Sequence, residues 1–453
     1  SFQTPECVLV YSDQGLNKLS QTYHDLYRER LVRGYWRDRT RPILLNNWEA
    51  TYFDFNEEKL LTIAKTAKEL GIELFVLDDG WFGKRDDDTS SLGDWHEDKA
   101  KLPRGVDYVA DKVEELGLKF GLWFEPEMVC KDTKLFEKHP DWLLSTPNRP
   151  TSHGRNQFVL DFSRQEVVDY IFQQMNTIIS KSNISYIKWD MNRHMTEVYS
   201  SSLPAEQQGE VFHRYILGVY QLYERLIEKY PHILFESCAG GGARFDPGML
   251  YYAPQTWTSD DTDAVERLKI QYGMSMVYPL SSIGSHVSAV PNHQVGRTPP
   301  LSTRAAVAYF GTFGYELDVT KLIDEEKKEV RQQIDFFKAY RSLIREGDFY
   351  RLLSPFDQNE TSWMTVSKDK RKALVGFYKV LAQPNEAYQR LKLKGLNRNK
   401  KYEVNGEKIY YGDELMNIGI ILADNYIDRA DEYWSREHPG DYQSRLFIIQ
   451  EVE

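Results

Sequence analysis

Short apolar runs alternate with stretches of helical period from residue 41 onward. Each apolar run ends in polar or aromatic residues and continues into a loop, and most are followed by positions that are apolar every three to four residues. The eight apolar runs are residues 42–48, 72–79, 120–126, 158–162, 185–192, 233–239, 254–260 and 280–286. The helical stretches are residues 57–70, 107–116, 166–180, 205–229, 263–276 and 303–313.

This alternation predicts an α/β fold with parallel strands, because a helix between two strands returns the chain to the same edge of the sheet. Eight such units predict a closed (β/α)8 TIM barrel, which needs about 250 residues. The alternative is a doubly wound open sheet. It is disfavoured because no Gly-x-Gly-x-x-Gly sequence follows the first run, and because chemically useful residues end nearly every run.

Two segments flank the predicted barrel, which together with a charged helix over 324–344 occupies residues 41–349. Residues 1–40 are predicted to be an approach segment with one amphipathic helix over 17–31. From 350 to 453 the pattern changes to short β-type runs at 363–366, 372–378, 388–393 and 444–449, with no convincing helix. This last part predicts a small antiparallel β-sandwich domain.

Charge and composition limit the function classes. The formal net charge of -11 disfavours nucleic acid and anionic membranes as partners, since both bind basic surfaces. No stretch is long and apolar enough to span a bilayer. Aromatic residues form 13% of the chain, and their rings suit the apolar faces of an uncharged carbohydrate substrate. Cys7, Cys130 and Cys238 lack metal-type spacing, which favours a reducing, cytoplasmic location.

Residues 186–193 hold the strongest candidate chemistry, because they form a short apolar strand that ends in a charge cluster. Alternate residues of a strand share a face, so Lys188, Asp190 and Asn192 are predicted to point to one side. If that side lines a barrel mouth, the Lys188 ammonium favours the ionised form of Asp190, which suits a carboxylate nucleophile. A structural ion pair at the strand end is the alternative.

Carboxylates and tryptophans also close other predicted strands. They include Trp48 after the first run, Asp78, Asp79 and Trp81 after the second, Trp123, Glu125 and Glu127 after the third, Arg155 before the fourth, Glu236, Cys238 and Gly240 after the sixth, and Trp257 and Asp260 after the seventh. Because active sites of TIM barrels lie at the carboxyl ends of the strands, we expect these residues to surround one pocket. Paired carboxylates in a pocket are what cleavage of a glycosidic bond requires.

Several of these residues permit other interpretations. Asp78 and Asp79 could bind magnesium, but the neighbouring tryptophans Trp48, Trp81 and Trp123 favour a sugar. The glycine run 240–242 could bind phosphate, although such a run more often marks a tight turn or a close backbone approach.

Two histidines and one cysteine are further candidates for chemistry. His286 and His293 lack the spacing of zinc ligands, so a loop or packing role is predicted. Cys238 has no neighbouring base and is predicted to be a wall residue rather than a nucleophile.

The chain resembles the retaining α-galactosidases of glycoside hydrolase family 36, bacterial type. The resemblance runs through five motifs, LDDGWFG at 77–83, GLWFEPEM at 121–128, YIKWDMN at 186–192, FESCAGGG at 235–242 and WTSDDTD at 257–263. It implies that Asp190 is the nucleophile and Asp260 the acid/base. It further implies a set of galactose contacts, with Trp48 at the pocket rim: Asp78, Asp79, Trp123, Arg155, Lys188, Asn192, Cys238 and Gly240.

The implied reaction is the removal of terminal α-galactose from melibiose- and raffinose-type oligosaccharides, through a covalent intermediate and without a metal or organic cofactor. Rival activities are a galactosyl transferase of the raffinose-synthase kind, an α-N-acetylgalactosaminidase, a sugar-binding protein on an inactive barrel, and a metal-dependent hydrolase. Similar members of the family usually carry a large β-sandwich domain before the barrel, whereas this chain opens almost directly on the predicted first helix. The oligomeric state is therefore not predicted, and a homo-oligomer is possible.

Overall fold

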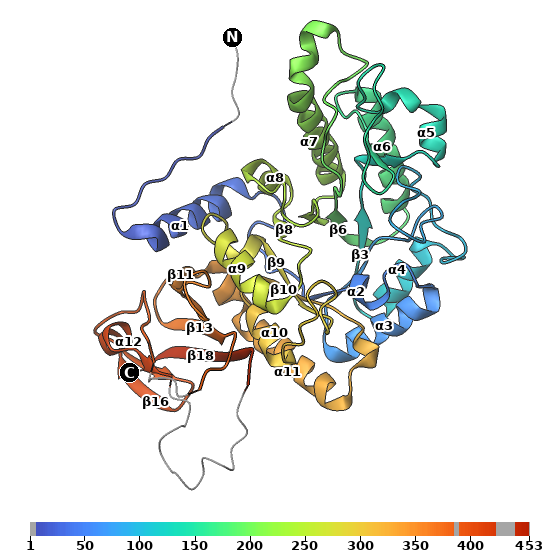
Figure 1. Cartoon of the computed structure of the whole chain (residues 1–453). Helices are drawn as coiled ribbons and strands as arrows, with labels where there is room; N and C mark the ends of the chain where they lie inside the picture. The colour runs from blue at the N-terminus through green and yellow to red at the C-terminus, as the bar shows by residue number, and fades with distance from the viewer. Residues whose placement is uncertain (1–5, 385–388, 423–439, 453) are drawn as a thin grey trace.

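The computed structural model describes residues 6–384, 389–422 and 440–452. Eight parallel strands form a closed barrel in the order β1-β10-β9-β8-β7-β6-β3-β2 (Figure 1). The strands are β1 (Leu44–Asn46), β2 (Leu74–Leu77), β3 (Lys119–Phe124), β6 (Ile184–Trp189), β7 (Leu234–Ser237), β8 (Gln255–Trp257), β9 (Ile283–Ser288) and β10 (Thr312–Glu316). The prediction of a TIM barrel followed by an antiparallel domain is confirmed.

Two elements of the predicted barrel were wrong. The run at 158–162 overlaps β5 (Gln157–Val159), which pairs antiparallel with β4 (Met128–Cys130) outside the barrel. The last barrel strand is instead β10, part of which was predicted as the end of a helix over 303–313. The strand has only five residues and is separated from the end of α10 by three residues, and a run this short cannot be distinguished by its pattern from the end of a buried helix.

Helices lie between the barrel strands and cover the barrel. They are α2 (Trp48–Thr51), α3 (Glu57–Leu70), α4 (Val106–Glu115), α5 (Lys134–Lys138), α6 (Gln165–Ile179), α7 (Val211–Lys229), α8 (Pro247–Tyr252), α9 (Ala264–Met274), α10 (Leu301–Ala308) and α11 (Asp324–Glu346). Short helical turns occur at η2 (Pro140–Trp142), η3 (Ala205–Glu210), η4 (Leu280–Ser282) and η5 (Val319–Lys321). Local sequence determines where these helices begin and end. For example, α3 begins where the Asn56 side chain accepts a hydrogen bond from the Lys59 amide, and it ends at Gly71, whose φ is +94°.

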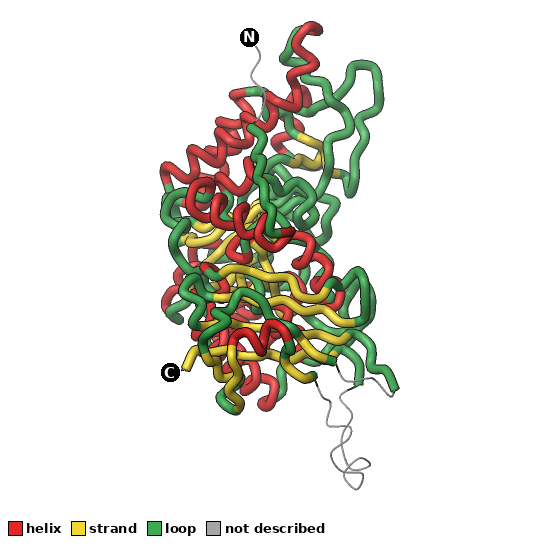
Figure 2. Tube along the Cα trace, turned by 90° about the vertical axis from the view of Figure 1, so that its left-hand side faces the viewer, coloured by secondary structure: helices red, strands yellow, loops and turns green. Residues whose placement is uncertain are grey.

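The C-terminal part contains a six-stranded antiparallel sheet, whose strands lie one above another in the lower half of Figure 2, and a separate two-stranded pair. The sheet order is β11 (Asp348–Leu353), β12 (Glu360–Val366), β13 (Lys372–Lys379), β18 (Gln443–Val452), β15 (Lys401–Val404) and β16 (Lys408–Tyr411). The pair is β14 (Arg390–Leu391) with β17 (Ile420–Ile421). Contrary to the sequence-based expectation, this part also contains a helix, α12 (Gly412–Asn417). Residue 388, at the start of one predicted strand, lies outside the described residues.

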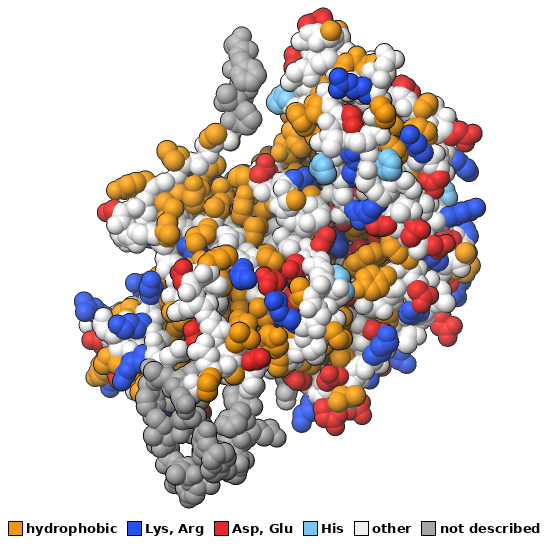
Figure 3. Space-filling view, viewed as in Figure 1, with side chains coloured by type: hydrophobic (Ala, Val, Ile, Leu, Met, Phe, Trp, Pro, Cys, Tyr) orange, Lys and Arg blue, Asp and Glu red, His pale blue; other side chains and the backbone are white. Residues whose placement is uncertain are grey.

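The N-terminal segment contains α1 (Gly15–Leu26), which continues into a π-helical turn, η1 (Tyr27–Leu31). This pair of elements matches the helix predicted over 17–31. The side chain of Gln21 donates a 3.2 Å hydrogen bond to the carbonyl of Phe349, so α1 packs beside the first strand of the C-terminal sheet. Charged side chains of both signs are spread over the face shown in Figure 3. None of the helices in the described ranges has both the length and the apolar character needed to cross a membrane.

Candidate functional site

Side chains from the carboxyl ends of the barrel strands, and from the loops that follow them, line a cavity of about 230 Å³. Nine of the eleven residues predicted from the sequence lie in its wall: Trp48, Asp78, Asp79, Trp123, Arg155, Lys188, Asp190, Asn192 and Asp260. The other two, Cys238 and Gly240, lie beside the cavity rather than in its wall. This convergence follows from parallel strands in one barrel, whose carboxyl ends all point the same way.

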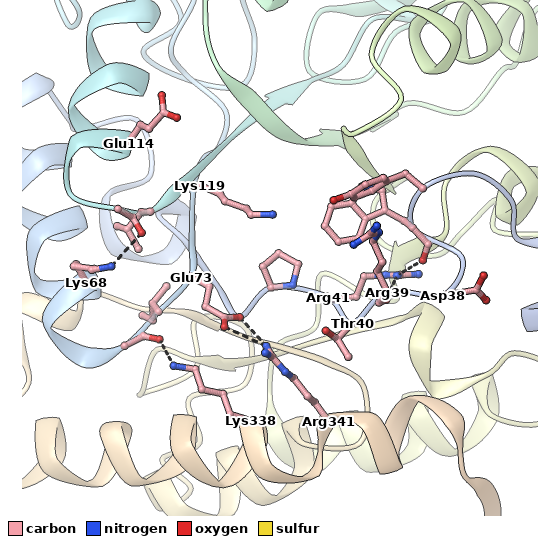
Figure 4. A pocket seen from close by; sticks show the side chains of 17 residues that line it. Asp38, Arg39, Thr40, Arg41, Lys68, Glu73, Glu114, Lys119, Lys338 and Arg341 are labelled. Carbon is pink, nitrogen blue, oxygen red and sulfur yellow. Dashed lines mark hydrogen bonds and ion pairs between the residues drawn. The ribbon is translucent and has the colours of Figure 1, made fainter. Parts of the chain in front are cut away.

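A larger cavity of about 900 Å³ lies at the opposite end of the barrel, before the first three strands (Figure 4). Several of its charged groups have partners within the protein. Arg341 binds Glu73 at 2.9 Å, and the ammonium groups of Lys68 and Lys338 donate to backbone carbonyls. Because this end of a TIM barrel serves stability, the smaller cavity is the candidate active site.

The carboxylate of Asp190 is held by two hydrogen bonds. The indole N–H of Trp123 donates to Oδ2 at 3.2 Å, and the Met191 amide donates to Oδ1 at 2.8 Å. The Asp190 amide itself donates to the carbonyl of Phe124 at 2.8 Å, which extends the pairing of β6 with β3 by one residue. Donors aimed at both oxygens fix the direction of this carboxylate.

Two cations balance the acidic pair at the end of β2. Lys188 Nζ lies 2.8 Å from Asp78 Oδ2, and Arg85 grips both oxygens of Asp79 at 2.6 and 2.7 Å. Burial raises the pKa of Asp79, against the opposing effect of Arg85. Since lysine and arginine occupy these carboxylates, the arrangement favours recognition of hydroxyl groups over magnesium binding. No group of three or more potential ligands suited to a metal ion occurs within residues 6–384, 389–422 and 440–452.

Asp260 follows β8 and lines the cavity. The surrounding protein opposes its ionisation, and the nearby negative charge of Asp190 adds to this effect. Burial and the charge of Asp190 raise the pKa of Asp260 to about 6, with smaller contributions from Glu316 and Asp78. The charge of Lys188 opposes this rise. A carboxyl group with such a pKa carries a proton in mildly acidic solution, as a general acid must.

The glycine run 240–242 makes a close backbone approach rather than a phosphate site. Gly240 and Gly241 have φ values of +55° and +85°. A Cβ atom on Gly241 would lie only 2.5 Å from Cα of Ser259, so this turn supports the segment that carries Asp260. The thiol of Cys238 is buried, and burial together with the charges of Asp190 and Asp260 raises its pKa well above the usual value, which disfavours a nucleophilic thiolate.

The structure also changes several expectations for single residues. Trp81, counted among the tryptophans that favour a sugar, is fully buried, and its indole donates to the carbonyl of Trp123 at 2.9 Å. His293 lies in a loop, as expected, but it lines the cavity, 3.4 Å from Glu49. His286 lies in β9 and binds Glu316.

Other wall residues escaped the sequence analysis. Asp88 pairs with Arg155 at 3.2 Å across a long loop, for which the sequence carries no signal. Glu49 follows Trp48 directly, so its place beside a predicted strand end could have been noticed. Its burial, followed by the charge of Glu316, raises its pKa to about 8. Finding Glu316 required the recognition of β10 as a strand.

Comparison with known protein families gives two matches along the chain. The family described as Melibiase matches residues 1–347, and the family described as Glycosyl hydrolase family 36 C-terminal domain matches residues 360–449. Among characterised proteins, α-galactosidase AgaA of Geobacillus stearothermophilus is 61% identical over 434 residues, which is 96% of this chain and 60% of AgaA. α-Galactosidase Mel36A of Lactobacillus acidophilus is 54% identical over 95% of this chain and 58% of its own length.

Solved structures of α-galactosidases are similar to this chain as well. The crystal structure of AgaA superposes with a TM-score of 0.94 and 59% identity, over 98% of this chain and 60% of AgaA. The galactosidase domain of AgaSK superposes with a TM-score of 0.90 and 44% identity, over 97% of this chain and 58% of that domain's chain. The chain therefore spans about three fifths of the length of these relatives.

Proposed function

The chain belongs to the melibiase family, glycoside hydrolase family 36, and on that premise we propose that it is a retaining exo-α-galactosidase. The proposed substrates are oligosaccharides with terminal α-linked galactose, of the melibiose and raffinose type. Variants of AgaA have been crystallised in complex with raffinose and with stachyose, which supports this substrate class for a relative that shares most of the barrel.

The observation that carries the proposal is the presence of Asp190 and Asp260 in one cavity, in different electrostatic surroundings. Asp190 has hydrogen-bond donors on both oxygens, whereas the pKa of Asp260 is raised to about 6. Such a pair supplies an ionised nucleophile and a protonated acid at the same pH.

The proposed mechanism has two steps. In the first, Asp190 attacks the anomeric carbon of galactose while Asp260 gives its proton to the departing glycosidic oxygen, which leaves a covalent galactosyl ester. In the second step, Asp260 takes a proton from water, the water oxygen attacks the anomeric carbon, and the ester bond to Asp190 breaks. Two inversions restore the original α configuration.

The sugar itself is proposed to be held by the groups around these acids. Asp78, paired with Lys188, and Asp79, paired with Arg85, offer acceptors to galactose hydroxyl groups, and Trp48 borders the entrance. No cofactor takes part in the proposed steps. A cytoplasmic location is also proposed, and it rests on three cysteines that form no disulfide.

The test is to incubate the full chain with raffinose and to follow the anomeric protons of the released sugar by NMR. Early appearance of α-galactose supports the proposal. Early appearance of β-galactose would overturn the retaining mechanism, and transfer of galactose to a second sugar in place of water would point to a transferase.

A further inference from the structure

Glu316 is a carboxylate at the active site to which the proposed mechanism gives no task. It is the last residue of β10, it is only 2% exposed, and it contributes to the wall of the cavity that holds Lys188 and Asp260. A buried carboxylate in such a place is costly unless other groups compensate it. Its surroundings therefore indicate what it does.

His286 holds Glu316 in a fixed position. The Nδ1 atom of His286 lies 2.9 Å from Oε2 of Glu316, and the imidazole is stacked on the indole of Trp257 with the ring centres 4.3 Å apart. Gly314 leaves room for this ring, because a Cβ atom at that position would lie 2.9 Å from Cδ2 of His286. Side chains from three neighbouring strands, β8, β9 and β10, thus pack against one another around Glu316.

Charged groups from four other segments interact electrostatically with Glu316. Lys188 of β6 and Arg267 of α9 are the cations, and Glu49 of α2 and Asp260 after β8 are the carboxyl groups. Burial opposes the ionisation of Glu316, but the hydrogen bond from His286 and the charges of Lys188, His286 and Arg267 outweigh it, so the pKa of Glu316 is lowered. Glu49 has a raised pKa, so the negative charge of this pair resides on Glu316.

Lys188 therefore interacts electrostatically with two anions. Its ammonium donates to Asp78 at 2.8 Å, and Glu316 is the second anion that acts on it. Without Glu316, the net charge that acts on Asp260 would be more positive, and a more positive surrounding favours the deprotonated form of a carboxyl group. The same charge of Glu316 also acts directly on Asp260.

We propose that Glu316, held by His286, is a positioning residue that balances the Lys188 ammonium and thereby keeps Asp260 in the form that carries a proton. The proposal rests on the proposed glycosidase function and gives it a further residue. Glu316 acts through Lys188 and Asp260.

The test compares Glu316→Gln with the wild type in the pH profile of kcat/KM for p-nitrophenyl α-galactoside. Glutamine keeps the shape and can still accept the hydrogen bond from His286, so the fold is retained while the charge is removed. The high-pH limb is expected to move to lower pH by about half a unit or more. Glu210→Gln removes a carboxylate on the surface that pairs with Arg214, and it serves as the matched control with an unchanged profile.

An active Glu316→Gln variant with the wild-type pH profile would overturn this inference and leave the proposed function intact. A wild-type chain without activity would instead count against the proposed function. Calorimetric binding of galactose at pH 5 and pH 8 then tests the role of Glu316: the variant is expected to differ from the wild type in how affinity changes with pH. Equal behaviour, or no binding by either protein, would overturn the inference.

Discussion

The indole N–H of Trp123 lies 3.2 Å from Oδ2 of Asp190, so the end of β3 holds the carboxylate at the end of β6. The two residues are 67 positions apart in the sequence, and the pairing of Trp123 with Lys188 in the parallel ladder brings them together. The barrel thus fixes the direction of the proposed nucleophile through a side chain that also lines the cavity.

Trp123→Phe is therefore expected to reduce activity without unfolding the protein. The change removes one hydrogen bond to an ionised group, which contributes about 1.5–3 kcal/mol, so kcat/KM should fall about tenfold to a hundredfold. Steady-state kinetics with p-nitrophenyl α-galactoside measure the loss. Trp142→Phe, away from the cavity, is the control, and equal rates for the two variants would contradict the role of Trp123.

The pH dependence of activity should follow Asp260. Its pKa is raised to about 6, first by burial and then by the charge of Asp190, and the active form is the protonated one. kcat/KM should therefore be highest on the acidic side of this value and fall as the pH rises through about 6. In Asp260→Asn the remaining activity should lack this limb. A limb that persists in Asp260→Asn would assign it to another group.

The turn at Gly241 is expected to be essential for activity. In Gly241→Ala the new Cβ atom would meet Cα of Ser259 at 2.5 Å, at a residue whose φ of +85° already disfavours a side chain. The segment carrying Asp260 must then move, and kcat should fall about a hundredfold. Gly209→Ala is the matched control, since no atom lies within 4 Å of its added Cβ. Full activity in Gly241→Ala would show that this contact does not position Asp260.

The pair of Arg85 and Asp79 should contribute to stability as well as to the site. Arg85→Met leaves the Asp79 carboxylate buried without its cation, and the free energy of unfolding should fall by about 3 kcal/mol or more. Arg214→Met breaks an exposed pair with Glu210 and should cost less than about 1 kcal/mol. Chemical denaturation of both variants gives the comparison, and similar losses would contradict the structural importance of the buried pair.

The sequence predicted the barrel and most of the cavity wall because polar residues such as Asp78, Lys188 and Asp190 stand directly after apolar runs. The sequence-based prediction failed where apolar runs do not distinguish a barrel strand from other buried segments. The run at 158–162 is as apolar as a barrel strand but pairs with β4, and the buried strand β10 resembles a buried helix. Glu316 was missed for this second reason.

Long-range partners could not be predicted from the sequence either. Arg155 was included through family resemblance, but its contact with Asp88 depends on how two loops fold against each other. The link between Gly241 and Ser259 depends in the same way on the packing of two neighbouring strand ends. Such contacts are set by tertiary packing and have no local sequence pattern.

The most direct test of the account is the release of p-nitrophenol from p-nitrophenyl α-galactoside by the wild-type chain and by Asp190→Ala, both in the presence of a chelator. The account predicts turnover by the wild type that the chelator does not reduce, and a loss of about 10³-fold or more in the variant. Turnover by Asp190→Ala at a rate close to that of the wild type would contradict the assignment of Asp190 as the nucleophile.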